Sequence, residues 1–131
     1  MEGAEDFLAE LSKRGYRLFL ASNGTLAVQE GRIASAGIAK YFEKMFISEQ
    51  LGAVKPQKEF FDICFAQIPG FARERAVILG DSLTSDILGG INVGIKTCWF
   101  NPKGKQGRED IHPDGEIRHL SQFVPWLEEQ D

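Results

Sequence analysis

The chain has 131 residues, long enough for one domain with a sizeable core, and its 43% hydrophobic and 26% charged content is typical of a soluble globular protein. A net charge of −4 and the lack of any Lys/Arg run argue against nucleic acid as a partner. No apolar stretch reaches the roughly 18 residues of a membrane span, and no signal-peptide pattern occurs, so no membrane partner is expected. Two distant cysteines, Cys64 and Cys98, favour a cytoplasmic location over a disulfide framework.

Helices and strands are predicted in near-strict alternation along the chain. In order, the predicted elements are a helix over 2–14, a strand over 18–21, a helix over 25–36, a strand over 44–47, a helix over 59–68, a strand over 76–79, a helix with Ile87, Leu88 and Ile91 on its apolar face, a strand over 95–100 and a helix over 121–129. Residues 101–115 are a predicted loop. This alternation predicts an α/β fold with a doubly wound, mostly parallel sheet and helices on both faces.

The predicted helix over 59–68 carries one apolar stripe at the spacing of a single helix face. Its members are Phe61, Cys64, Phe65 and Ile68. We interpret this stripe as core packing and not as a cofactor site, because a surface helix of a globular protein buries such a face. In the last helix Ser121 is the expected N-cap, and Pro125 is tolerated only in the first turn.

The chain is organised around the stretch from Ala76 to Gly94. Asp81 and Asp86 follow a buried strand, and Thr84 and Ser85 between them can cap the next helix. In open α/β sheets the ligand crevice lies outside the carboxyl ends of the strands. Two carboxylates there suit a hard divalent cation, which takes oxygen ligands. The alternative is that both aspartates are only turn and cap residues.

Two further polar segments follow other strands. Ser22, Asn23 and Gly24 come after the strand over 18–21 and offer a hydroxyl and backbone N–H groups to an anion, although a plain turn explains them equally well. Lys55 precedes Pro56, which favours an extended backbone at Lys55 just before a helix. A lone loop lysine is usually a solvated surface charge.

These groups are expected to converge at one edge of the sheet. Ser22, Lys55 and Asp81 each lie beyond the carboxyl end of a different predicted strand. Parallel strands bring their carboxyl ends to the same edge, so the convergence supports a site more strongly than any single motif does.

The motifs FLASNG, VKP and VILGDSLTSD, in this order, resemble motifs two, three and four of the haloacid dehalogenase-like (HAD) hydrolases. The resemblance extends over nearly the whole chain. The segments ASNG, GAVKPQKEFFD and ILGDSLTSDILGG look most like the pyrimidine 5′-nucleotidase branch. The resemblance implies a Rossmann-type HAD fold and a Mg²⁺-dependent phosphate-monoester hydrolase acting on nucleoside monophosphates.

The resemblance also implies a role for each matched residue. Ser22 would hydrogen-bond the transferring phosphoryl group, with Asn23 and Gly24 beside it in the substrate site. Lys55 would neutralise the charge of the phosphate and the nucleophile. Asp81 would ligate Mg²⁺, and Asp86, also a metal-site residue, would hold Lys55 or a metal-bound water. These roles agree with phosphoryl transfer, which depends on positioning and on positive charge around the phosphoryl oxygens.

The chain departs from the family at its first motif. No Asp-x-Asp pair, which supplies the nucleophile and the general acid in the family, follows any predicted strand, and the helical cap is absent. Residues 1–131 are therefore expected to be the carboxyl-terminal part of a HAD core, inactive alone. In the family, the missing strand lies between the strands that end at Ser22 and Gly80. We expect these strands to pair directly or to accept a second copy or another segment in the slot, and the remaining alternative is a fragment that folds poorly in isolation.

Two alternatives from other classes remain open. A receiver-type signalling domain is also a doubly wound sheet with aspartates, a hydroxyl and a lysine at one edge, but its acidic cluster comes first, whereas here Lys55 precedes Asp81. A non-catalytic binding module on the same fold is the second alternative, and the missing Asp-x-Asp pair supports it.

Overall fold

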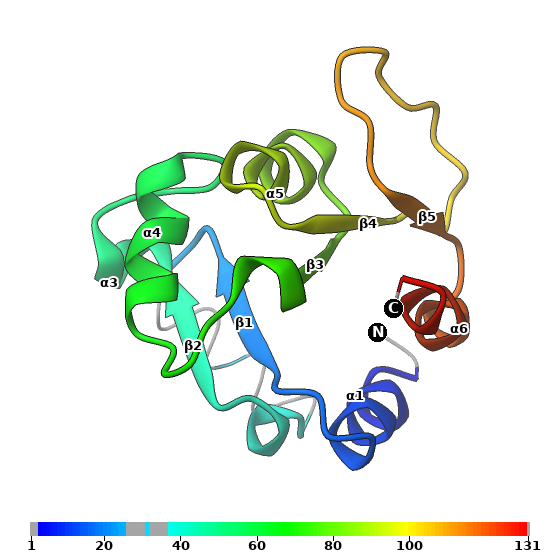
Figure 1. Ribbon diagram of the computed structural model, residues 1–131, viewed down its shortest axis with the longest axis horizontal. Helices are drawn as coiled ribbons and strands as arrows, with labels where there is room; N and C mark the ends of the chain where they lie inside the picture. The colour runs from blue at the N-terminus through cyan, green and yellow to red at the C-terminus, as the bar shows by residue number, and fades with distance from the viewer. Residues whose placement is uncertain (1–2, 26–30, 32–36, 131) are drawn as a thin grey trace. The chain divides into compact units, whose positions relative to one another are not determined.

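The computed structural model describes residues 3–25, 31 and 37–130, which form two compact units, Met1–Gly52 and Ala53–Asp131. Each unit contains a small parallel sheet with helices around it (Figure 1). The parallel α/β architecture predicted from the sequence is therefore confirmed. None of the described helices is long and apolar enough to cross a membrane.

The first unit is built on a two-stranded sheet. Its elements are α1 (Ala4–Lys13), β1 (Phe19–Ser22), the 3-10 helix η1 (Ala39–Tyr41), β2 (Lys44–Ile47) and α3 (Ser48–Leu51). β1 and β2 pair in parallel, with Ser22 opposite Ile47. The rings of Phe19 and Phe46 stack at 6.0 Å between centroids. The helix expected over 25–36 lies outside the described residues, apart from its two isolated positions Thr25 and Gly31.

The second unit is built on a three-stranded sheet of order β3-β4-β5, with all pairs parallel. Its elements are α4 (Lys58–Ala66), η2 (Arg73–Arg75), β3 (Val77–Gly80), the π-helical turn η3 (Leu83–Ile87), α5 (Leu88–Val93), β4 (Lys96–Phe100), β5 (Gly115–Ile117), η4 (Leu120–Gln122) and α6 (Phe123–Glu128). The strands that end at Ser22 and Gly80 thus belong to separate sheets.

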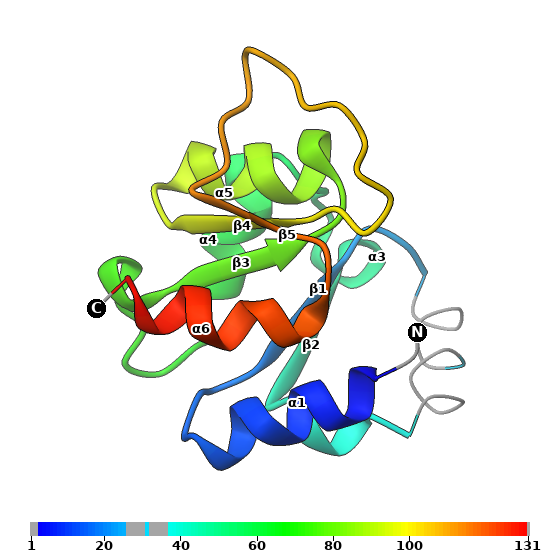
Figure 2. The same ribbon diagram turned by 90° about the vertical axis from the view of Figure 1, so that its right-hand side faces the viewer.

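Helices cover both faces of the three-stranded sheet. A Cβ on Gly90 would lie 2.6 Å from methyl groups of Ile78 and Thr97, so α5 packs tightly on the face to which those side chains point. A Cβ on Gly115 would lie 2.3 Å from the indole nitrogen of Trp126, so α6 packs on the opposite face. Figure 2 shows α5 above and α6 below these strands. This is the doubly wound arrangement that the sequence predicted.

The helix that follows β3 differs from the prediction at its start. Its N-cap is Ser82, whose hydroxyl accepts the Ser85 N–H at 3.2 Å, and not Thr84 or Ser85. The first turn is π-helical, with the Ile87 N–H bonded to the Ser82 carbonyl. The wider turn changes the helix phase. Ile91, expected on the buried face, is 42% exposed, whereas Ile87 is fully buried.

Two strand predictions are also corrected. The strand expected over 76–79 is β3, and its residues are only partly buried, because β3 lies at the edge of its sheet among the described residues. β5 was not predicted. It spans three residues, Gly115–Ile117, at the end of a long loop, and three residues are too few for a recognisable alternating pattern. β5 is defined by its parallel pairing with β4 and not by a pattern in its own sequence.

We predict that both cysteines resist alkylation in the folded chain. Cys64 and Cys98 are buried, and burial raises the pKa of each thiol from 9.0 to about 12. Because the thiolate is the reactive form, about a thousandfold less of it is present at pH 8 in the folded chain. Iodoacetamide labelling followed by mass spectrometry, native against urea-unfolded, measures this difference. Equal labelling rates in the two states would contradict the burial of these thiols.

Candidate functional site

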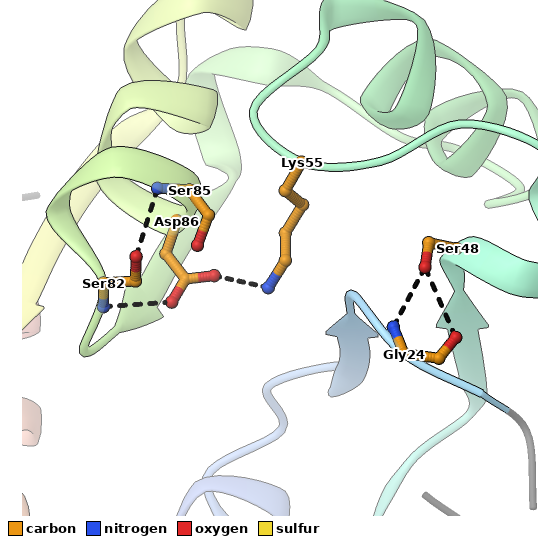
Figure 3. Close-up of polar contacts among 6 residues, drawn as sticks. All are labelled: Gly24, Ser48, Lys55, Ser82, Ser85 and Asp86. Atoms are coloured by element: carbon orange, nitrogen blue, oxygen red, sulfur yellow. Dashed lines mark hydrogen bonds and ion pairs between the residues drawn. The ribbon is translucent and has the colours of Figure 1, made fainter. Parts of the chain in front are cut away.

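A buried ion pair joins two of the predicted site residues. Lys55, just before α4, and Asp86, in η3, are 9% and 8% exposed, and Lys55 Nζ lies 2.5 Å from Asp86 Oδ1 (Figure 3). Lysine and aspartate are seldom this buried unless they are paired. The interpretation of Lys55 as a solvated surface charge is therefore wrong. The pair brings together residues that are 31 positions apart in the sequence.

The second oxygen of the Asp86 carboxylate is also held. The Ser82 N–H donates to Asp86 Oδ2 at 3.3 Å, within the turn that Ser82 itself caps. A Cβ on Gly80 would lie 2.3 Å from the same oxygen, so the carboxylate packs directly against the end of β3. The glycine at position 80 thus makes room for Asp86. This turn fixes the carboxylate at the carboxyl end of β3 (Figure 3).

Asp81 occupies a different environment in the same unit. It directly follows β3 and is exposed, and its backbone carbonyl accepts a hydrogen bond from the indole nitrogen of Trp99 at 3.0 Å. The backbone of this aspartate is thereby anchored to β4.

The donor set at this strand end fits a weakly held Mg²⁺. The described part of the chain contains no cluster of three or more His, Cys, Asp or Glu side chains suited to a metal ion. Mg²⁺ does not require one, since it keeps several waters and often uses one or two carboxylates together with substrate phosphate. The exposed carboxylate of Asp81 meets that requirement, whereas the Asp86 carboxylate already holds Lys55 and the turn.

The predicted anion-binding loop lies in the first unit, Met1–Gly52. Ser22 is the last residue of β1, and Asn23 and Gly24 follow it. The Gly24 N–H donates to the hydroxyl of Ser48 at 2.9 Å (Figure 3). The Gly24 carbonyl accepts the Glu49 N–H at 3.3 Å. Both the N–H and the carbonyl of Gly24 are thus hydrogen-bonded to the start of α3.

Sequence reasoning missed Ser48. It is 9% exposed and directly follows β2, as the Ser22 loop follows β1, and the paired register places Ser22 opposite Ile47. A hydroxyl at the end of a predicted strand was the available signal. This signal singled out Ser22, which follows the strand over 18–21, but not Ser48, which follows the strand over 44–47.

Comparison with known proteins shows the family. The sequence profile of the haloacid dehalogenase-like hydrolases matches residues 1–100. The pyrimidine 5′-nucleotidase PynA of Streptococcus pneumoniae is 41% identical over 128 residues, which is 98% of this chain and 54% of that protein. The pyrimidine 5′-nucleotidase YjjG of Escherichia coli is 37% identical over 111 residues, 85% of this chain and 49% of that protein.

Solved structures agree with the sequence matches. The HAD-hydrolase YfnB of Bacillus subtilis, crystallised with bound magnesium, has a TM-score of 0.93 at 38% identity, over 97% of this chain and 55% of that one. A HAD phosphatase from Thermococcus onnurineus has a TM-score of 0.87 at 28% identity, over 97% of this chain and 57% of that one.

The chain spans about half the length of the curated relatives it matches. The matched residues 1–100 include all three motifs that the sequence presented, from the Ser22 loop through Lys55 to Asp81 and Asp86. A receiver-type domain is not supported by these matches. The chain belongs to the haloacid dehalogenase-like hydrolases, in the branch that resembles the pyrimidine 5′-nucleotidases.

Proposed function

We propose that this chain forms the phosphate- and metal-binding part of a HAD-type phosphate-monoester hydrolase. The observation that supports this most directly is the buried Lys55–Asp86 pair beside the exposed Asp81. Burying two charges costs several kcal/mol of desolvation, and an apolar pair of similar volume is often as stable. Retention of the pair is better explained by a need for a fixed ammonium group than by stability.

In this proposal Lys55 supplies the positive charge that phosphoryl transfer requires. Charge spreads over the three equatorial oxygens of the transferring group, and catalysis depends on preorganised groups that neutralise it. Asp86 orients the Lys55 ammonium at 2.5 Å, and the Ser82 N–H keeps Asp86 in place. Of the two roles that the resemblance allowed for Asp86, we favour that of holding Lys55 over that of holding a metal-bound water.

Ser22 and Asp81 complete the proposed set of roles. The Ser22 hydroxyl would donate to a phosphoryl oxygen, and Asn23 would contribute from the same loop, whose Gly24 peptide is fixed by Ser48. Asp81 would hold Mg²⁺, which would neutralise phosphate charge when it is bound. The exposure of Asp81 and its anchored backbone support this assignment.

Nucleoside monophosphates are the proposed substrates, because two relatives at 37–41% identity are named pyrimidine 5′-nucleotidases. Other relatives are named phosphoserine phosphatase and glyceraldehyde 3-phosphate phosphatase, so the broader class is phosphate monoesters. A cytoplasmic location, self-association and a further strand that carries the Asp-x-Asp pair stay predictions.

We predict no turnover by these 131 residues alone. The sequence contains no Asp-x-Asp pair and therefore lacks the family's nucleophile. Assays with uridine monophosphate and p-nitrophenyl phosphate, at saturating Mg²⁺, should show only the buffer rate. Activity should appear in a longer protein that adds the first strand and the cap, and Lys55→Ala should abolish it.

The contrary result would be turnover by the 131-residue chain that disappears in Asp81→Asn. That outcome would place the nucleophile within these residues. A longer protein that binds nucleotides without turnover would instead support the non-catalytic binding module.

We also predict that the Lys55–Asp86 pair serves function more than stability. Lys55→Met alone leaves a buried unpaired carboxylate and should lower the free energy of unfolding by about 3–5 kcal/mol. The double variant Lys55→Met/Asp86→Leu should restore the free energy of unfolding to within about 1 kcal/mol of wild type. Urea unfolding followed by circular dichroism measures both values.

The matched control is the exposed pair of Lys58 and Asp62, in which Lys58 Nζ lies 2.8 Å from Asp62 Oδ2 and the side chains are 62% and 43% exposed. Lys58→Met should change the free energy of unfolding by less than about 1 kcal/mol. If the double variant stayed as unstable as Lys55→Met, the pair would be a structural requirement, and the functional explanation for its retention would fail.

A further inference from the structure

We propose that Trp99 is a positioning residue for the metal ligand Asp81, and that Ile111 of the β4–β5 loop anchors its ring. The inference rests on the proposed function, since it gives Trp99 a role only if Asp81 holds Mg²⁺. It assigns a site role to a residue of β4 and to a loop that lie outside the three motifs.

The first observation is the hydrogen bond from the Trp99 indole. Trp99 is 4% exposed, and its Nε1–H donates to the Asp81 carbonyl at 3.0 Å. Trp99 is paired with Gly80 in the sheet, so its indole lies across from the peptide at which β3 ends. A buried indole N–H usually finds a partner, and here that partner is the backbone of the proposed metal ligand.

The second observation is the packing of the indole ring. Trp99 shares a buried cluster with Ile87 and Ile111, and Leu83 and Leu88 pack against it. Leu83 and Ile87 belong to η3, the turn that also carries Asp86. The Trp99 cluster therefore includes apolar side chains of the segment that leaves β3, and the indole also bonds the first residue of that segment.

The third observation concerns the loop between β4 and β5, residues 101–114. Its Ile111 is 3% exposed in the Trp99 cluster, and a Cβ on Gly107 would lie 3.7 Å from the ring. The start of the loop is fixed by Asn101, 2% exposed, whose amide donates to the Lys105 carbonyl and to Glu116, each at 2.9 Å. Two positions of the loop, Gly107 and Ile111, thus lie against the Trp99 ring or its cluster.

These contacts control the direction of the Asp81 side chain. Gly80 is fixed by its pairing with Trp99 in the sheet, and the hydrogen bond to the Asp81 carbonyl fixes the peptide that follows Asp81. With the backbone held on both sides, rotation about the Cα–C bond of Asp81 is restricted, and with it the direction of the Cα–Cβ bond. An aromatic residue that only filled space would not require the N–H. The N–H is therefore the group that separates a positioning role from core packing.

The experiment compares Mg²⁺ affinity, by isothermal titration calorimetry, in the wild-type chain, Trp99→Phe and Asp81→Asn. Trp126→Phe is the matched control, because Trp126 lies in α6 on the other face of the sheet. We expect Trp99→Phe to weaken Mg²⁺ binding about two- to tenfold, as the loss of one hydrogen bond implies, and Trp126→Phe to leave it unchanged. Asp81→Asn should abolish binding.

A second measurement separates loss of the N–H from loss of ring volume. Trp99→3-benzothienylalanine keeps the size of the ring but replaces the N–H with sulfur, and it should weaken Mg²⁺ binding as much as Trp99→Phe does. In the wild-type chain the ¹⁵N indole resonance of Trp99 should shift on Mg²⁺ addition, while that of Trp126 stays in place. The Trp99 shift should be lost in Asp81→Asn.

The outcomes distinguish the two proposals. Equal Mg²⁺ affinity in wild type and in the benzothienyl protein, with binding lost in Asp81→Asn, overturns the role of Trp99 and leaves the metal site standing. Equal binding by wild type and Asp81→Asn, or no binding by wild type, overturns the metal site and this inference with it.

Discussion

The structure of the candidate site depends on the burial of one ammonium group. Lys55 is sequestered from water, and its ion pair with Asp86 at 2.5 Å offsets the cost of burying the ammonium group. Asp86 lies in the π-helical turn η3, and Gly80 leaves room for its carboxylate. Replacing the glycine or tightening the turn would displace the carboxylate and leave a buried charge unpaired. The segment after β3 is therefore held by this ion pair as well as by the apolar packing of Ile87.

A second common feature is that strands in both units are followed by polar side chains that hold another segment of the same unit. Ser48 after β2 fixes the Gly24 peptide, Asp86 after β3 fixes Lys55, and Asn101 after β4 fixes the following loop. Each of these side chains is at most 9% exposed and each is hydrogen-bonded, as buried polar groups must be. In α/β proteins the carboxyl ends of strands carry the ligand sites. Rigid support of these segments is consistent with a proposed site that works by positioning.

The sequence predicted the order of the elements well because apolar runs and helical stripes are local signals. β2 has the predicted bounds, and the doubly wound sheet followed from alternation alone. Features that depend on distant partners were not predictable. The carboxylate that pairs with the buried Lys55 is 31 residues away, and the Trp99 indole donates to the end of a different strand. Residue types and their spacing do not reveal such contacts between distant positions.

The most direct test of the account follows the Lys55 ammonium group itself. Lys55, oriented by Asp86, is proposed to be the group that binds phosphate. In the ¹⁵N-labelled chain with Mg²⁺, titration with inorganic phosphate should shift the Nζ resonance of Lys55, while that of the exposed Lys58 stays in place. The Lys55 shift should disappear in Asp86→Asn. Phosphate binding that leaves the Lys55 resonance unchanged while it moves those of other residues would contradict the account.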